Sequence, residues 1–170
     1  YEVARTVYMQ AAFANDLFKG GWSAPWESTG GPQQLTGAKG WGHEDGSTTP
    51  GFAITDGVMA QLQLSYLAAG FKGCGLWSWN YRPAGFEAGD YALLNRQLRP
   101  TERAVRVGKI AQAAHKYREE IWKAHKEPQA GLLINWDNDA IWAAISVRQR
   151  DHFRHYPMQA RVGASRALIN

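Results

Sequence analysis

The feature that most constrains the fold is an alternation of helix-like segments with short apolar segments. Apolar residues at helical spacing predict helices over residues 3–18, 54–69 and 101–121. Between these helices lie residues 21–27 and 71–79, two short runs of aromatic and small residues that are typical of buried strands. The resulting order is helix, strand, loop, helix, strand, loop, helix. Because this order favours parallel strands joined by helical crossovers, we expect an α/β fold.

Capping residues and glycines mark the ends of the predicted elements. Thr101 is placed as the N-cap of the third helix, with Glu102 in its first turn. Gly70 closes the second helix, and Pro25 puts the first strand near its end rather than in the middle of a ladder. Because both strands run into loops, any chemistry that those loops carry should lie beyond the carboxyl ends of the strands.

The pattern restarts after residues 127–128. Residues 131–136 predict another strand, which Asp137 ends, and Asn138 or Asp139 then caps a further helix. We therefore expect one domain over residues 1–126 and the beginning of a second over residues 127–170.

Composition narrows the class of protein. With 45% hydrophobic and 20% charged residues the chain has the make-up of a soluble globular protein, and no run approaches the roughly 20 apolar residues of a membrane helix. The net charge of +4 comes with basic residues that fall mostly on one side of the third helix, which indicates a solvated face and not a nucleic-acid surface. Because Tyr1 is not preceded by a methionine and Asn170 closes an apolar stretch, we expect a fragment of a longer protein. A cytoplasmic location is a separate expectation, which the chain ends do not support.

The single cysteine, Cys74, excludes an internal disulfide and any cysteine-cluster metal site, and we expect it to be buried. A metal at His43-Glu44-Asp45 is not favoured, because adjacent loop residues rarely converge on one ion. Serine-triad chemistry has no support, because no serine has the surroundings of a nucleophile elbow. Residues 137–139 lack the glycine and the distal glutamate of a calcium loop. We expect neither a metal nor an organic cofactor.

The first candidate for chemistry is Glu27, which follows Trp26 at the end of the first predicted strand. Small residues come next, so a ligand could approach this carboxylate. Glycosidases need such a carboxylate as nucleophile or base. The alternative is a surface glutamate that pairs with an arginine, and these few residues do not decide between the two.

The second candidate is the segment after the second predicted strand. Trp79 can offer a flat apolar face to a sugar ring, while polar side chains nearby, Arg82, Glu87 and Asp90, hydrogen-bond its hydroxyl groups. Arg82 and Asp90 could equally form a structural ion pair, and Glu87 is the strongest of the three candidates.

Taken together, Pro25-Trp26-Glu27-Ser28 and the segment from Trp77 to Asp90 resemble glycoside hydrolase family 42, the β-galactosidase-like enzymes of clan A, over nearly the whole chain. The resemblance implies the C-terminal portion of a (β/α)8 TIM barrel, with Glu27 as nucleophile at the end of strand seven. Trp79 matches the substrate-facing tryptophan of strand eight, and Glu87 matches a glutamate that contacts the sugar. Asp90 stands where typical members have a histidine, which puts strict galactose specificity in question.

The resemblance also implies the remaining parts of the enzyme. Residues 127–170 would begin the α/β, flavodoxin-like or amidotransferase-like domain through which family members form homotrimers. The acid/base glutamate would precede Tyr1, so it is absent from this chain. The expected activity is retaining hydrolysis of terminal β-D-galactosides. The alternatives are another clan A exo-glycosidase, a β-mannosidase or an α-L-arabinopyranosidase, or a non-catalytic carbohydrate-binding protein. The partner is a carbohydrate, not a nucleic acid or a membrane.

Two structural expectations follow from the resemblance. Glu27, Trp79 and Glu87 should converge on one pocket, because all three follow strand ends. A cis peptide bond is also expected after Trp77 or Trp79, as at the end of strand eight in family members.

Overall fold

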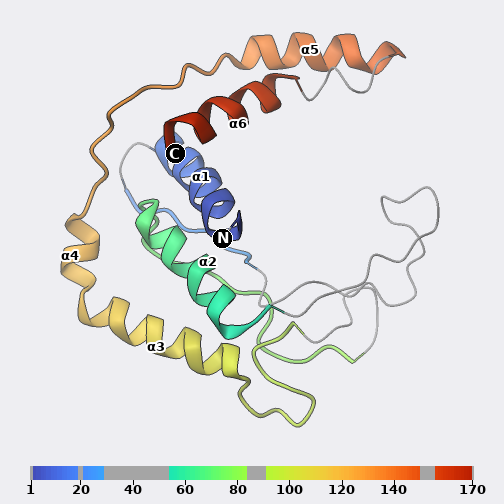
Figure 1. Ribbon diagram of the computed structural model, residues 1–170. Coiled ribbons are helices and arrows are strands. Elements are labelled where there is room, and N and C mark those ends of the chain that lie inside the picture. Colours follow the sequence, from blue (N-terminus) through green and yellow to red (C-terminus); the bar gives the residue numbers. More distant parts are fainter. Residues whose placement is uncertain (1, 19–20, 29–53, 84–90, 150–155, 170) are drawn as a thin grey trace. The chain divides into compact units, whose positions relative to one another are not determined.

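The computed structural model describes residues 2–18, 21–28, 54–83, 91–149 and 156–169. Within these ranges the chain forms six helices, and it divides into two units, Tyr1–His125 and Lys126–Asn170 (Figure 1).

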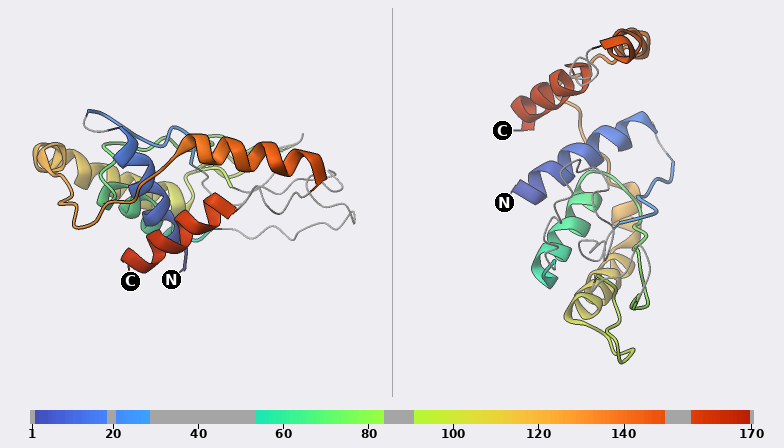
Figure 2. Two further views of the ribbon diagram at one scale, coloured as in Figure 1. Left: turned by 90° about the horizontal axis from the view of Figure 1, so that it is seen from above. Right: turned by 90° about the vertical axis from the view of Figure 1, so that its right-hand side faces the viewer.

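The first unit is built on four helices: α1 (Glu2–Leu17), α2 (Asp56–Ala68), α3 (Glu102–Lys116) and α4 (Arg118–Lys123). Helix α2 packs against both α1 and α3, and two further views show this arrangement (Figure 2). Thr101 accepts a hydrogen bond from the amide of Ala104 at 3.3 Å, so its predicted role as N-cap is confirmed. The helix predicted to continue to residue 121 is interrupted at Tyr117, where the backbone leaves helical geometry (φ −103°, ψ 25°) and α4 begins.

The predicted α/β fold is wrong, because no sheet forms among the described residues. Residues 21–28 and 71–77 are extended and run in the same direction, and three backbone amides of the second segment donate to carbonyls of the first. These bonds are Lys72 to Ser23, Gly75 to Pro25 and Trp77 to Ser28, each at 2.8 Å. The segments therefore lie beside each other where strands were predicted, but they do not make a (β/α)8 barrel portion.

The irregular spacing of these three bonds explains the absence of a ladder. The paired residues differ by 49, 50 and 49 positions (72 − 23, 75 − 25 and 77 − 28), so the register slips by one residue and returns. Evenly spaced bonds are the mark of a regular parallel pair. Pro25 also has no amide hydrogen to return to the neighbouring segment. The outcome is a pair of braced extended segments rather than strands of a sheet.

One cluster of buried apolar residues packs Phe71, of the second extended segment, against residues of α1 and of the end of α2. Ala11, Ala69 and Phe71 form this cluster, against which Tyr8 and Tyr66 pack; the Tyr66 and Phe71 rings meet edge to face at 6.1 Å. Other buried apolar residues lie on α1, on α2 and in the segment before α3: Met9, Met59, Leu62, Tyr91, Ala92, Leu93 and Leu94.

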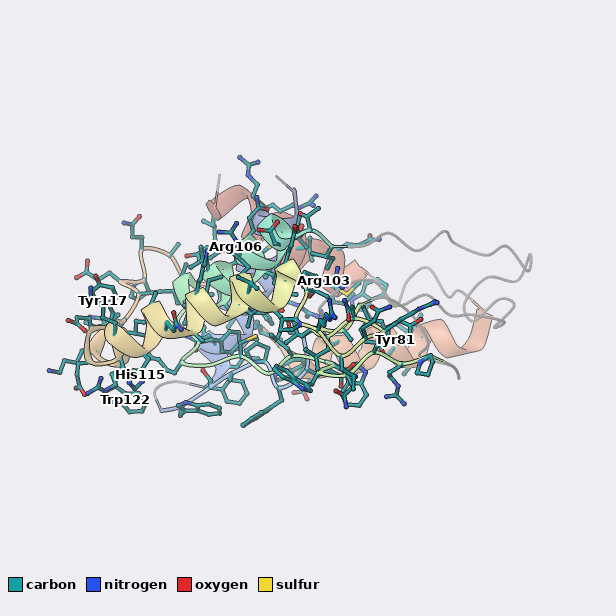
Figure 3. The ribbon with its side chains drawn as sticks, turned by 90° about the horizontal axis from the view of Figure 1, so that it is seen from below. Tyr81, Arg103, Arg106, His115, Tyr117 and Trp122 are labelled. Carbon is teal, nitrogen blue, oxygen red and sulfur yellow. The ribbon has the colours of Figure 1, made fainter. Side chains whose placement is uncertain are left out.

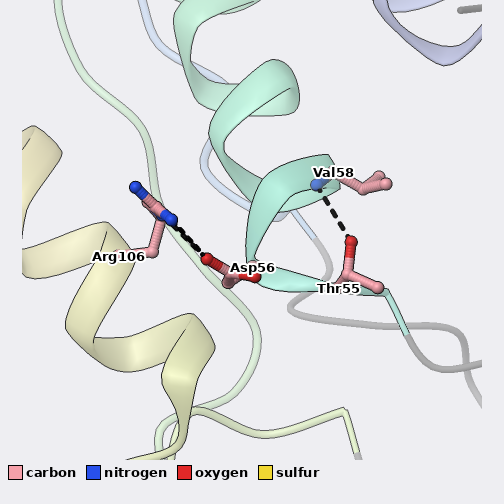
Figure 4. Close-up of polar contacts among 4 residues, drawn as sticks. All are labelled: Thr55, Asp56, Val58 and Arg106. Carbon is pink, nitrogen blue, oxygen red and sulfur yellow. Dashed lines mark hydrogen bonds and ion pairs between the residues drawn. The ribbon is translucent and has the colours of Figure 1, made fainter.

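Polar contacts join the same elements. Arg106 of α3 forms an ion pair with Asp56 at 2.6 Å, and Thr55 caps α2 by accepting from the amide of Val58 (Figure 4). Lys72 donates from Nζ to the carbonyls of Ile121 and Ala124, at 2.6 and 2.8 Å. These carbonyls lie at the C-terminal end of α4, where a helix leaves acceptors unpaired, so the lysine attaches α4 to the second extended segment.

The second unit consists of two helices, α5 (Trp136–Gln149) and α6 (Tyr156–Ile169), and Arg161 pairs with Asp139 at 2.5 Å. The strand predicted over residues 131–136 is wrong, and with it the beginning of a flavodoxin-like domain, because these residues form no strand and α5 begins at Trp136. The predicted caps Asn138 and Asp139 lie inside α5. Asn135 does the capping, accepting through Oδ1 from the amides of Asp137 and Asn138 at 2.9 and 3.2 Å.

Among the described residues, no helix is both long enough and apolar enough to span a membrane.

Candidate functional site

Glu27 lies at the end of the first extended segment, between two residues whose positions are fixed. Pro25 accepts a backbone hydrogen bond from Gly75, and Ser28 accepts one from Trp77, both at 2.8 Å. Ser23, at the start of the segment, donates its hydroxyl to Asn15 of α1 at 2.7 Å. The side chain of Glu27 is exposed. The backbone on either side of the carboxylate is therefore held, while the carboxylate itself is open to a ligand.

Trp26 is brought close to the second segment by a glycine. A Cβ added to Gly75 would lie 2.1 Å from the carbonyl oxygen of Trp26, so no larger residue fits there without displacement of the backbone. The Trp26 ring lies 5.1 Å from the ring of Trp22 at an angle of 47° and is 76% exposed. An indole this exposed has its face available to an apolar ligand surface, such as the C–H face of a sugar.

Trp79 lies on the neighbouring segment and is 62% exposed. Its carbonyl accepts from the amide of Leu94 at 2.9 Å, and that of Ser78 accepts from the amide of Leu93 at 3.0 Å, so residues 78–79 are also held by the segment before α3. The peptide bond between Trp77 and Ser78 is cis, as expected from the family resemblance.

The structure places Glu27 and Trp79 on adjoining segments. The hydrogen bond from Trp77 to Ser28 lies one residue from Glu27 and two residues from Trp79. The other residues of the predicted site, Glu87 and Asp90, lie outside the described residues, and their convergence with Glu27 stays a prediction.

Arg82 takes a position that the sequence did not indicate. Its guanidinium carbon lies 5.3 Å from the centre of the Trp77 ring, a cation–π distance. The indole Nε1 of Trp77 is buried and has no hydrogen-bond partner in the described part of the chain. Arg82 thus packs on the half-buried tryptophan of the segment, while Trp79 is the exposed one.

Two polar side chains, Tyr66 and Cys74, lie near the hydroxyl of Ser28, the residue after Glu27. The Ser28 hydroxyl is buried and makes no hydrogen bond of ordinary geometry with the described residues, yet it lies near the Tyr66 hydroxyl and the Cys74 thiol. Burial raises the pKa of the Tyr66 hydroxyl, and the neighbouring Ser28 offsets part of that rise. Burial around the sulfur likewise raises the pKa of the Cys74 thiol. Cys74 as a residue is exposed, so the prediction of a buried cysteine is wrong.

Sequence analysis missed a contact between Tyr81 and Arg96. Arg96 donates from Nε to the Tyr81 hydroxyl at 2.8 Å, and its guanidinium carbon lies 5.1 Å from the centre of the tyrosine ring. Figure 3 shows Tyr81 at the end of the first unit away from Trp122, with Arg103 and Arg106 on α3 between them. The contact joins loop residues 15 positions apart, which no local pattern links. From sequence, Arg96 was counted among the basic residues that fall mostly on the polar side of the third helix, but α3 begins at Glu102.

No protein-family model and no curated protein matches this chain. The resemblance to glycoside hydrolase family 42 therefore rests on the two motifs themselves.

Proposed function

We propose that this chain carries the nucleophile, Glu27, of a retaining glycoside hydrolase that acts on terminal β-D-galactosides. The observation that supports the proposal most is the placement of an exposed carboxylate between exposed tryptophans on two adjoining segments. Trp26 precedes Glu27, and Trp79 lies two residues from the hydrogen bond that joins Trp77 to Ser28. A carboxylate on a fixed backbone beside aromatic faces is what binding and attack on a pyranoside require.

In the proposed reaction, a Glu27 carboxylate oxygen attacks the anomeric carbon as the bond to the leaving oxygen breaks through an oxocarbenium-like transition state. A second carboxylic acid protonates the leaving oxygen, and as a carboxylate it then takes a proton from the water that hydrolyses the glycosyl ester. The resemblance assigns this second group to a glutamate outside the present chain. Two inversions at the anomeric carbon give net retention.

The exposed tryptophans also favour a second candidate, a non-catalytic carbohydrate-binding protein. Trp26 and Trp79 would stack on sugar rings whether or not Glu27 reacts. The two candidates differ in a single outcome, the formation of a covalent bond between Glu27 and the sugar.

The test uses the full-length polypeptide that carries this chain. Glu27→Gly should abolish hydrolysis of an aryl β-D-galactoside, and added azide should restore cleavage of an activated substrate with the α-configured galactosyl azide as product. An activated 2-deoxy-2-fluoro-β-galactoside should leave its sugar on the Glu27 peptide of the wild type, as detected by mass spectrometry.

Glu127→Gly is the matched control, because Glu127 is an exposed glutamate outside the helices and should leave turnover unchanged. Wild-type activity in Glu27→Gly, or a β-configured azide, would show that Glu27 is not the nucleophile. Galactoside binding without turnover in the wild type would favour the binding protein.

A further inference from the structure

The loop over residues 94–100 is held in one conformation beside Trp79. Leu94 and Pro100 form an antiparallel bridge at its base. Asn95 accepts from the amides of Gln97 and Arg99 through Oδ1, at 2.9 and 3.0 Å, and its carbonyl accepts from Leu98 at 2.9 Å. The backbone of Arg96 is enclosed by these bonds, so the side chain starts from a fixed position.

The guanidinium of Arg96 is aligned by Tyr81. Its Nε donates to the tyrosine hydroxyl at 2.8 Å, and this bond leaves the two terminal amino groups to point elsewhere. A planar guanidinium with its two terminal donors available matches the two oxygens of a carboxylate or a sulfate. Tyr81 lies two residues after Trp79, and the amide of Leu94, two residues before Arg96, donates to the Trp79 carbonyl. The aligned arginine therefore belongs to the same local structure as the exposed tryptophan.

The described residues near Trp79 and Arg96 in the sequence carry positive charge, while Glu27 lies on the neighbouring extended segment. Residues 77–83 and 91–100 contain three arginines, Arg82, Arg96 and Arg99, and no aspartate or glutamate. Arg82 lies against Trp77. Of these three arginines, Arg96 is the one that the Tyr81 hydroxyl aligns, and its positive charge attracts an anion.

We propose that Arg96, aligned by Tyr81, binds an anionic group, a carboxylate or a sulfate, on the sugar that stacks on Trp79. This inference rests on the proposed function and names its substrate class as acidic β-galactosides. The neutral sugar would use the tryptophan face alone, whereas the acidic sugar would add a charge-assisted, two-point contact.

The experiment compares three aryl substrates in the full-length polypeptide: a β-D-galactoside, the corresponding β-D-galacturonide and the 6-sulfated β-D-galactoside. The wild type should favour at least one acidic substrate by kcat/KM. Arg96→Gln should lower kcat/KM for that substrate by roughly tenfold to a hundredfold, the size of a lost hydrogen bond to a charged group, and leave the neutral substrate within about twofold. Tyr81→Phe removes the hydroxyl that aligns Arg96 but keeps the ring. Its kcat/KM for the acidic substrate should lie between those of Arg96→Gln and the wild type. The uronide and the sulfate distinguish the two anions.

Arg99→Gln is the matched control, because it removes an exposed arginine from the same loop and should leave the preference unchanged. The preference should also weaken as salt is raised, since an exposed ion pair is screened. Equal losses on all three substrates in Arg96→Gln, or an equal effect of Arg99→Gln, would overturn the inference.

Titration of the Glu27→Gln protein with the galacturonic acid, galactose 6-sulfate and galactose monosaccharides, followed by NMR, separates this inference from the proposed function. Tighter binding of an acidic sugar that Arg96→Gln abolishes, without turnover in the wild type, would support the inference and overturn the hydrolase. Turnover without a preference for acidic sugars would support the hydrolase and overturn the inference. If the protein shows no turnover and no preferential binding of an acidic sugar, the proposed hydrolase and this inference are both overturned.

Discussion

Gly75 and Trp26 approach so closely that a side chain on the glycine is excluded: a Cβ at Gly75 would lie 2.1 Å from the carbonyl oxygen of Trp26 and 2.8 Å from its carbonyl carbon. The obstacle is backbone, which cannot rotate away as a side chain can. The contact lies beside the hydrogen bond from Gly75 to Pro25, so it sets how closely the two extended segments run next to Glu27.

Gly75→Ala should therefore lower the free energy of unfolding by about 1–3 kcal/mol, the usual cost of an overpacked site, and displace the backbone around Glu27. Urea unfolding measures the first effect. The control is Gly108→Ala in α3, where an added Cβ meets nothing within 4 Å and a helical alanine should stabilise by roughly 0.5–1 kcal/mol. If Gly75→Ala and Gly108→Ala had the same midpoint of urea unfolding, the two extended segments would be able to move apart without a loss of stability.

The helices were predictable because their signals are local. A threonine before an acidic residue marks the start of α2 and of α3, and Gly70 with φ +102° ends α2. The side chain of Asn15 also lies where a Cβ on Gly70 would be, at 2.5 Å, which no sequence pattern could show.

The sheet could not be predicted in the same way. Residues 21–27 and 71–79 were predicted as strands, and this is wrong, because a strand needs a neighbour in regular register and the extended residues 21–28 and 71–77 do not provide one. That register is interrupted where Gly75 meets Trp26. The exposed Cys74 and the contact from Tyr81 to Arg96 likewise depend on which segments meet in space. Glu27, Trp26 and Trp79 were singled out from the sequence as site residues; all three are exposed, and their roles stay predictions.

A second prediction concerns Lys72, whose Nζ donates to two carbonyls at the end of α4. Lys72→Met keeps most of the aliphatic chain and removes the charge, so it should cost about 1–2 kcal/mol of unfolding free energy and raise amide exchange over residues 118–124. Hydrogen exchange with mass spectrometry gives the local effect. Lys109→Met, at an exposed lysine of α3, should change neither quantity. Unchanged exchange in α4 after loss of Lys72 would show that packing alone holds this helix.

A third prediction follows from the ion pair between Arg106 and Asp56 (Figure 4). The hydrogen bond from Arg106 lowers the pKa of Asp56 below its ordinary value of 3.8. A carboxyl group with a lower pKa in the folded state contributes stability that is present above pH about 4 and lost as the pH falls through the folded-state value. The midpoint of urea unfolding should therefore drop between pH 5 and pH 2 by more in the wild type than in Arg106→Gln. Arg99→Gln removes an arginine that does not pair with Asp56, so the midpoint of urea unfolding should fall with pH as it does in the wild type. Identical slopes in all three proteins would remove the pair as a source of acid sensitivity.

The last prediction concerns the 170-residue chain by itself: it should bind a β-galactoside without hydrolysing it. Retaining hydrolysis requires two carboxyl groups roughly 5–5.5 Å apart, one to bond to the anomeric carbon and one to move protons. The described segments of the site, residues 21–28 and 71–83, hold one acidic residue, Glu27, and the resemblance assigns Glu87 to sugar contact and the proton donor to a glutamate outside this chain. The tryptophan faces do not depend on a second acid, so tryptophan fluorescence should report saturable binding of an aryl β-galactoside while release of the aryl group stays at the uncatalysed rate. Trp79→Ala should weaken this binding, and Leu98→Ala, at an exposed apolar residue of the 94–100 loop, should leave it unchanged. Turnover by the isolated chain that Glu27→Gln abolishes would show that the chain holds its own proton donor, and the division of the two carboxyl groups between this chain and another part of the enzyme would then be wrong.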